Sequence, residues 1–161
     1  MTGALGNGLW AMAIACGVMA GVYLTFSSFV MSSLEAVPIP EGISAMQSIN
    51  RVILKSLFMP LFFITSLASL ALTIWGIYRW GHSGASLMVI GGLVYLLGMF
   101  VCTAAFNVPL NDALDAVDPT APAAAEVWSD YLRTWTRWNH VRAVSSVVAC
   151  ALFLASAAKL S

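Results

Sequence analysis

The chain has 161 residues, of which 60% are hydrophobic and only 9% are charged, with a mean hydropathy of +0.88. A soluble domain carries about 25% charged residues, so the composition indicates a membrane protein, and the length suits one domain over residues 1–161. Basic and acidic side chains balance and no basic cluster occurs, which argues against nucleic acid as a partner. The three cysteines lie singly in apolar runs and are expected to be buried thiols: Cys16, Cys102 and Cys150.

Four apolar segments approach or exceed the roughly 20 residues that a membrane-spanning helix needs. They cover residues 8–34, 56–78, 86–106 and 143–158. Together they predict an all-α fold, a four-helix transmembrane bundle. Segment two has a helical lead-in from Gly42, and Pro60 is expected to kink it.

The fourth segment is short, so the helix that contains it must be longer. Counting about 20 residues back from Ala158 reaches Asn139, which puts Asn139 and Arg142 inside the bilayer or at its edge. Asp118 before Pro119 has the pattern of a helix N-cap and first-turn proline. Helix four is therefore expected to begin near residue 120, with a long extramembrane extension.

An even number of spans places both termini on the same side of the membrane, and all seven acidic residues at the other end. Orientation follows the number of Lys and Arg residues near the spans. The acid-rich end carries five of these residues and the other end two, or three and two if Arg51 and Arg142 are left out. The count favours a cytoplasmic position for the acid-rich end, in the plasma or inner membrane. The five are Arg51, Lys55, Arg133, Arg137 and Arg142; the two are Arg79 and Lys159.

Asn107 and Asn111 flank Pro109 directly after the third apolar segment, where the helix is expected to end. A buried amide without a hydrogen-bond partner costs about 2–7 kcal/mol, so these asparagines need partners. Asn50 after segment two and polar residues at the start of segment four are candidates. The sequence therefore predicts a polar site at the acid-rich end of the bundle.

Four residues of helix four share one face through their i, i+3, i+4, i+7 spacing: Trp135, Trp138, Asn139 and Arg142. They form either an aromatic belt at the membrane surface or an inward-facing binding surface. A charge inside the membrane favours the inward, functional interpretation.

Three further residues are candidate substrate contacts with a structural alternative. Gln47 and Asn50 share a helix face and either enter the site or lie in a solvated turn. Thr25 either faces the site or hydrogen-bonds to its own helix.

His140 is a candidate general base because an unperturbed imidazole has a pKa near 6.5. Helical geometry nevertheless turns it about 100° away from Asn139.

On segment one, the Gly17-x-x-x-Gly21 pattern predicts either packing inside the bundle or a homo-oligomer.

Sequence motifs of several common enzyme classes do not occur in this chain. No carboxylate lies inside a span, only His82 accompanies His140, and no phosphate-binding or dinucleotide fingerprint occurs. Neither a metal nor an organic cofactor is predicted.

Three motifs carry a resemblance that extends across the whole chain: residues 45–50 (AMQSIN), the Asn107-x-Pro109-x-Asn111 run, and the set Trp135, Asn139 and Arg142. The chain resembles the small integral-membrane family that includes the fungal anthrone oxygenases. The resemblance implies a four-helix membrane bundle that oxygenates a polycyclic aromatic or similar lipophilic substrate without a cofactor.

In such a site, the three asparagines 107, 111 and 139 and Arg142 would donate hydrogen bonds to a developing oxyanion. Trp135 and Trp138 would form planar walls. His140 does not belong to the family pattern. The alternative is a non-enzymatic module that binds or moves a lipophilic or anionic small molecule.

Overall fold

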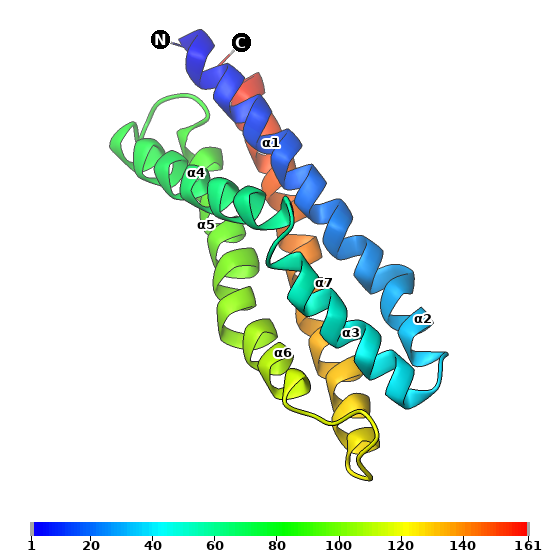
Figure 1. The fold of residues 1–161 in the computed structure, drawn as a ribbon. Helices are drawn as coiled ribbons and strands as arrows, with labels where there is room; N and C mark the ends of the chain where they lie inside the picture. The colour runs from blue at the N-terminus through cyan, green and yellow to red at the C-terminus, as the bar shows by residue number, and fades with distance from the viewer. Residues whose placement is uncertain (1, 161) are drawn as a thin grey trace.

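The computed structural model describes residues 2–160, which fold into helices without a β-strand. Four of these helices are long and apolar enough to cross a membrane: Gly3–Glu35, Phe58–Tyr78, Ala85–Asp115 and Ala124–Ala158. The predicted all-α, four-span architecture is therefore confirmed. Figure 1 shows the N- and C-termini close together at one end of the bundle, as an even number of spans requires.

The first and third spans each change helix type along their length. Span one consists of α1 (Thr2–Thr25), the π-helical segment η1 (Phe26–Val30) and α2 (Met31–Glu35). Span three consists of α5 (Ala85–Tyr95), the π-helical segments η2 (Leu96–Val101) and η3 (Thr103–Asn107), and α6 (Val108–Asp115). π-Helical turns are rare and often occur at functional sites, and both spans carry them at a similar level of the bundle.

The helix α7 (Ala124–Ala158) is the central element, packed between α1 on one side and α5 on the other. Its 35 residues span about 52 Å at 1.5 Å per residue, whereas the hydrocarbon core of a bilayer is about 30 Å thick. The N-terminal part of α7 therefore extends beyond the membrane, as the sequence predicts.

The helix α4 (Phe58–Tyr78) packs against α5 through close backbone contacts. A Cβ atom at Gly92 would lie 2.0 Å from the Thr73 hydroxyl, and one at Gly98 would lie 1.9 Å from the Ser145 hydroxyl on α7. These two positions of span three require glycine because helices approach there without room for a side chain.

Segment two differs from the prediction. It forms two helices, α3 (Ile39–Ile53) and α4, separated by a turn at residues 54–57 (Figure 1). Pro60 does not kink a continuous helix; it lies in the first turn of α4, where its missing N–H has no intrahelical partner to lose. The lead-in begins at Ile39 rather than Gly42, because a proline at position 40 is tolerated in a first helical turn.

The predicted helix end at Asn107 is also wrong. The chain stays helical through Pro109 to Asp115, because η3 absorbs the change of register and Pro109 falls in the first turn of α6. Asp118 does not cap α7, which begins six residues later at Ala124. Its carboxylate instead accepts hydrogen bonds from the backbone and hydroxyl of Thr120, and these bonds hold the pKa of Asp118 below its usual value.

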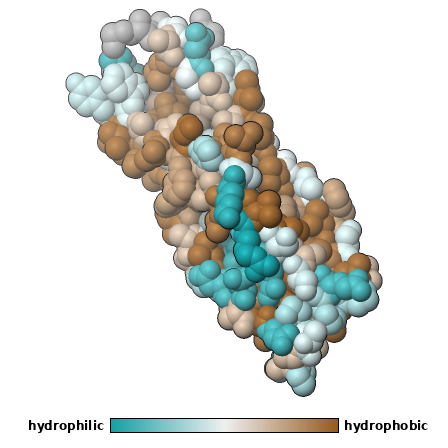
Figure 2. Space-filling view, viewed as in Figure 1, coloured by the Kyte–Doolittle hydropathy of each residue, from teal (hydrophilic) through white to brown (hydrophobic). Residues whose placement is uncertain are grey.

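Two hydrophobic cores stack along the bundle. One fills the membrane part around Met19, Tyr95 and Phe153, and the other fills the extramembrane part around Met46 and Trp128. Figure 2 shows the corresponding surface, hydrophobic over α4 and α5 and increasingly hydrophilic toward α3 and the end of α6.

The two glycines of the Gly-x-x-x-Gly pattern are exposed on α1. A Cβ at Gly17 would meet only the Cys150 sulfur, at 3.9 Å, and one at Gly21 would meet nothing within 4 Å. The pattern therefore does not pack tightly inside the bundle, and association between copies of the chain through it stays a prediction.

Candidate functional site

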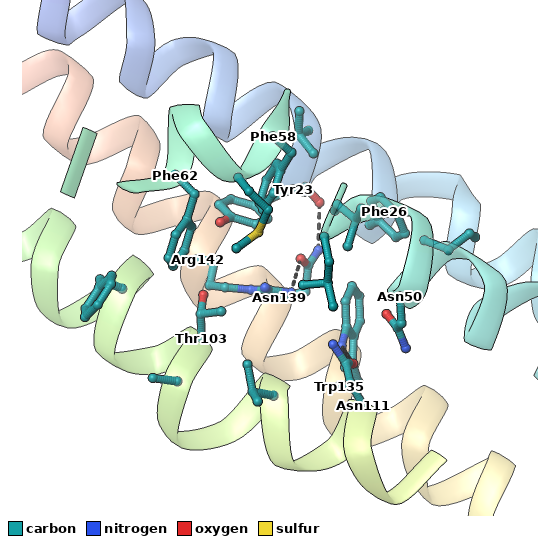
Figure 3. Close-up of a pocket in the computed structure, with 18 of the residues that line it drawn as sticks. Tyr23, Phe26, Asn50, Phe58, Phe62, Thr103, Asn111, Trp135, Asn139 and Arg142 are labelled. Carbon is teal, nitrogen blue, oxygen red and sulfur yellow. Dashed lines mark hydrogen bonds between the residues drawn. The ribbon is translucent and has the colours of Figure 1, made fainter. Parts of the chain in front are cut away.

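A cavity of about 270 Å³ lies where the two hydrophobic cores meet. All four spans and α3 contribute to its wall, which is mostly aromatic and aliphatic (Figure 3). The polar side chains that line it include those of Asn50, Asn111, Asn139 and Arg142. With Trp135, which also lines it, the structure thus brings five of the predicted site residues, from three separate segments of the sequence, to one cavity.

Arg142 is the central charged group of this cavity. Its side chain is only 5% exposed, and among the described residues it forms no ion pair. The guanidinium lies over two ring faces, 4.6 Å from the Tyr23 centroid and 4.9 Å from the Trp135 centroid. Each cation–π contact of a desolvated guanidinium contributes about 2 kcal/mol. The rings therefore stabilise a cation that no carboxylate neutralises.

The hydrogen bonding of Arg142 within residues 2–160 leaves its buried Nε–H group without a partner. One terminal NH₂ group donates to the Asn139 side-chain oxygen at 2.8 Å, while the Nε–H group is buried without an acceptor in residues 2–160. Figure 3 places Phe58 and Phe62 on the opposite side of the guanidinium from Thr103. A buried donor without a partner costs about 1–3 kcal/mol, more when charged, so this geometry suits a ligand that supplies an acceptor or a negative charge.

Asn139 holds Arg142 in position and is fully buried. Its NH₂ group donates to the Tyr23 carbonyl and to the Ser27 hydroxyl, both at 2.7 Å. These two bonds turn the Asn139 oxygen toward Arg142. Both acceptors lie where α1 passes into the π-helical η1, whose wider turns disturb the regular pairing of backbone carbonyls.

A second polar network lines the opposite part of the cavity. The Asn111 side-chain oxygen accepts hydrogen bonds from the Tyr131 hydroxyl and the Trp135 ring N–H, both at 2.8 Å. Asn50 donates a longer bond, 3.4 Å, to the same tyrosine. Tyr131 also stacks on Trp135 with ring centroids 6.0 Å apart. The network fixes the Trp135 ring, which forms both a wall of the cavity and a face for Arg142.

Two other predicted residues support the cavity from outside. Asn107 is buried, donates to the Trp135 carbonyl at 3.3 Å and leaves its side-chain oxygen without a partner in the described chain. Gln47 donates to the carbonyls of Leu114 and Val117 at 2.9 Å each, which ties α3 to the end of α6. Neither side chain lines the cavity.

Three predicted site residues lie elsewhere. Thr25 is exposed and bonds back to the Gly21 carbonyl at 2.8 Å. Trp138 stacks on Phe106 with centroids 3.7 Å apart and planes inclined by only 3°. His140 is exposed and lines a separate groove of about 530 Å³ between η1–α2 and α7. Helical spacing already turns His140 away from Asn139, and the structure agrees with that geometry.

Among the described residues, no group of three or more His, Cys, Asp or Glu side chains is placed to hold a metal ion. The family model for anthrone oxygenase matches residues 46–152, more than half of the chain. This chain belongs to the anthrone oxygenase family. Comparisons with curated proteins and with solved structures found no match.

The anthrone oxygenase match contains the polar residues of the cavity from α3, α6 and α7, from Asn50 to Arg142. It does not reach Tyr23 on α1, which the sequence analysis also missed. The polar residues that follow Tyr23, Thr25 and Ser27, could equally bond to their own helix and so do not single it out. Its proximity to Arg142 depends on how α1 packs against α7, and that packing leaves no local pattern.

Tyr131 is the second functional candidate that sequence reasoning missed in this anthrone oxygenase family member. Here a signal existed, because Tyr131 precedes Trp135 by four residues and Asn139 by eight, which places all three on one helix face. The aromatic walls from Phe58, Phe62 and Phe100 had no such signal. They lie in apolar spans where any phenylalanine could equally face lipid.

Proposed function

We propose that this protein is an oxygenase that converts a lipophilic aromatic ketone with an acidic C–H group, of the anthrone type, into the corresponding quinone. The observation that carries the proposal is the buried Arg142, which faces an aromatic cavity without a carboxylate partner and with a free Nε–H donor. Membership in the anthrone oxygenase family supports the same reaction class.

The reaction needs an electron-rich enolate. Loss of a proton from the substrate CH₂ group places negative charge on the ketone oxygen, and a preorganised guanidinium stabilises such a charge far more in a dry site than in water. Arg142 would bind this oxygen, with Asn139 fixing the orientation of the guanidinium. Trp135 and Tyr23 would flank the planar rings.

Molecular oxygen then acts as the oxidant. The enolate carbon transfers electrons to O₂ and forms a C–O bond, giving a hydroperoxide once the distal oxygen takes up a proton. Cleavage of the O–O bond with loss of the remaining C–H proton releases water and leaves a carbonyl. The net change is CH₂ plus O₂ to C=O plus H₂O, so one oxygen atom enters the product and one enters water.

The cavity also sets the substrate size. Small-molecule sites commonly measure about 300–1,000 Å³, and a cavity of about 270 Å³ lies just below that range. Such a volume favours a compact, flat molecule over a bulky lipid. This selection is consistent with a fused aromatic ring system.

One observation favours a second candidate function. Within the described wall of the cavity no Asp, Glu or His occurs, so no conventional general base contacts the space. A module that binds or moves a lipophilic anion would need Arg142 and the aromatic walls but no base. In the enzyme, the proton lost by the CH₂ group would instead pass to the distal oxygen of the peroxide, so that no base of the protein retains it and no net proton leaves the cavity.

The decisive experiment is oxygen consumption by the purified protein in lipid nanodiscs with anthrone as the substrate, without added metal, flavin or nicotinamide. We expect a rate above the spontaneous oxidation of anthrone, one O₂ consumed per anthraquinone formed, and one labelled atom in the new carbonyl when ¹⁸O₂ is supplied. Saturable binding of anthrone without any rate above background would replace the oxygenase with the binding module.

The orientation in the membrane is a separate proposal. The excess of Lys and Arg favours a cytoplasmic position for the end that carries α3 and the start of α7. A single cysteine introduced at Ser129, which is exposed there, should react with a membrane-impermeant maleimide only after the cells are opened. Labelling in intact cells would reverse the orientation.

A further inference from the structure

The cavity is sealed unequally on its two sides. On the extramembrane side, polar contacts from α3 close it. Arg51 forms an ion pair with Asp115 at 2.5 Å, and Asn50 contacts Tyr131. Gln47 donates to one carbonyl in α6, that of Leu114, and to one beyond it, that of Val117. These bonds join α3 to α6, to the chain beyond α6 and to α7, so they block a direct route from water.

On the membrane side, the start of α4 faces η3 and the start of α6. No hydrogen bond or ion pair recorded for the described chain joins residues 57–63 to residues 103–108. The lining residues at this edge are apolar and exposed: Leu54 (63%), Phe63 (49%) and Val108 (42%), with Ala104 between them in the wall. A side chain that both lines a cavity and is exposed marks where the cavity opens.

This edge lies at membrane depth. Phe63 is 15 residues from Tyr78, the end of α4, or about 22 Å along the helix. Ala104 is 19 residues from Ala85, the start of α5, or about 28 Å. Both distances fall within the roughly 30 Å hydrocarbon core, so the part of the opening between Phe63 and Ala104 faces lipid. Val108, about 34 Å from the start of α5, marks the edge of the opening toward the membrane surface.

We propose that the cavity is filled from the bilayer, through a lateral portal between Leu54 and Phe63 on one side and Ala104 and Val108 on the other. The portal admits uncharged, membrane-dissolved aromatic molecules and excludes water-soluble anions. The turn at residues 54–57, which joins α3 to α4 outside any α-helix, forms one edge of the portal. The inference deepens the proposed function because it names the physical state in which the substrate arrives.

The test uses light-induced cross-linking, which reports access to the cavity without turnover. The protein is reconstituted in phosphatidylcholine vesicles and irradiated with benzophenone, which dissolves in the bilayer, or with benzophenone-4-carboxylate, which stays in water. Mass spectrometry then locates the label. We expect benzophenone to label cavity peptides that contain Met46 and Met59, and the carboxylate to leave them unlabelled.

Two neighbouring variants separate the portal from the rest of the surface. Ala104→Phe narrows the portal and should reduce cavity labelling by benzophenone several-fold, while labelling at the exposed Tyr78 stays the same. Ala105→Phe is the matched control, since Ala105 is also exposed in η3 but does not line the cavity. It should leave both labels unchanged.

Equal cavity labelling in wild type and Ala104→Phe, or equal labelling by the two probes, would overturn the portal. Absence of cavity labelling in the wild type would also overturn it. None of these three results bears on the proposed function, because oxygen uptake with anthrone is measured separately. A portal that passes every test could equally serve a protein without oxygenase activity.

Discussion

The two sides of α7 present the same kinds of side chain in opposite environments. One side carries Trp135, Asn139 and Arg142 into the dry cavity, where the guanidinium is 5% exposed. The other side carries Arg133, Arg137 and His140 along the open groove. Arg133 pairs with Asp130 at 2.5 Å, and both side chains remain more than half exposed.

Burial, rather than charge, therefore distinguishes the side of α7 that forms the candidate site. An exposed ion pair contributes about 0–1 kcal/mol and is screened by solvent. A buried cation without a counterion is expensive to maintain. It persists because aromatic faces and one amide oxygen hold it.

The largest expected effect comes from Arg142→Leu. Loss of the guanidinium removes the only cation that lines the described cavity, and the loss of one oxyanion donor typically slows turnover by about 10²–10³-fold. The turnover rate of Arg142→Lys should lie between those of the wild type and Arg142→Leu, because an ammonium keeps the charge but cannot match the planar, multiple-donor geometry of Arg. Initial rates of oxygen uptake with anthrone measure the effect.

Arg137→Leu is the matched control on the groove side of the same helix. It removes an equal charge from an exposed position and should leave the rate near that of the wild type. Equal losses for Arg142→Leu and Arg137→Leu would remove the distinction between the two sides.

Asn139→Ala should have the next largest effect. It leaves an Arg142 NH₂ group and the Ser27 hydroxyl without their partner, and unsatisfied buried groups cost about 1–3 kcal/mol. We expect a lower midpoint of thermal unfolding together with slower turnover.

Thr136→Ala, on the groove side, is the control and should change the free energy of unfolding by no more than about 0.5 kcal/mol. Thermal unfolding in the same detergent compares the two; a similar midpoint for both variants would contradict the role of Asn139.

Trp135→Phe should have a smaller effect, because a six-membered aromatic ring remains, while the N–H bond to Asn111 and the five-membered ring of the indole are lost. A neutral hydrogen bond contributes about 1 kcal/mol, and 1.4 kcal/mol corresponds to a factor of ten, so turnover should fall about fivefold. Trp138→Phe keeps the stack on Phe106 outside the cavity and should be almost silent. Measurement of KM and kcat for both variants tests whether Trp135 acts on the substrate, and a larger loss for Trp138→Phe would reverse the assignment.

The sequence predicts the parts of this molecule that follow from length and periodicity. The four spans and the extension of α7 rest on runs of apolar residues, and the shared face of Trp135, Asn139 and Arg142 rests on helical spacing. Trp138 satisfies the same spacing yet packs on Phe106. The helix face that these residues share is wider than the cavity, so its edge contacts the neighbouring span three instead.

The parts that could not be predicted depend on contacts between distant segments. The π-helical segments have no signature in the sequence, and they kept the chain helical through Pro109 where a helix end was expected. Tyr23 contacts Arg142 across 119 positions of sequence, a contact that only the packing of α1 on α7 creates. The break between α3 and α4 likewise removed the expected kink at Pro60.

The smallest expected effect is that of His140→Gln, the variant that tests whether the groove takes part in chemistry. His140 lines the groove and not the cavity, so a substrate beside Arg142 lies on the other side of the α7 backbone. We expect the rate and its dependence on pH, from about pH 5 to about pH 8, to match the wild type. A general base would give a rate that rises with pH as the imidazole loses its proton, and His140→Gln would abolish that rise. Loss of a pH-dependent step in His140→Gln alone would mean that the proton leaves the substrate toward the groove. In that case the two sides of α7 would act together in one reaction.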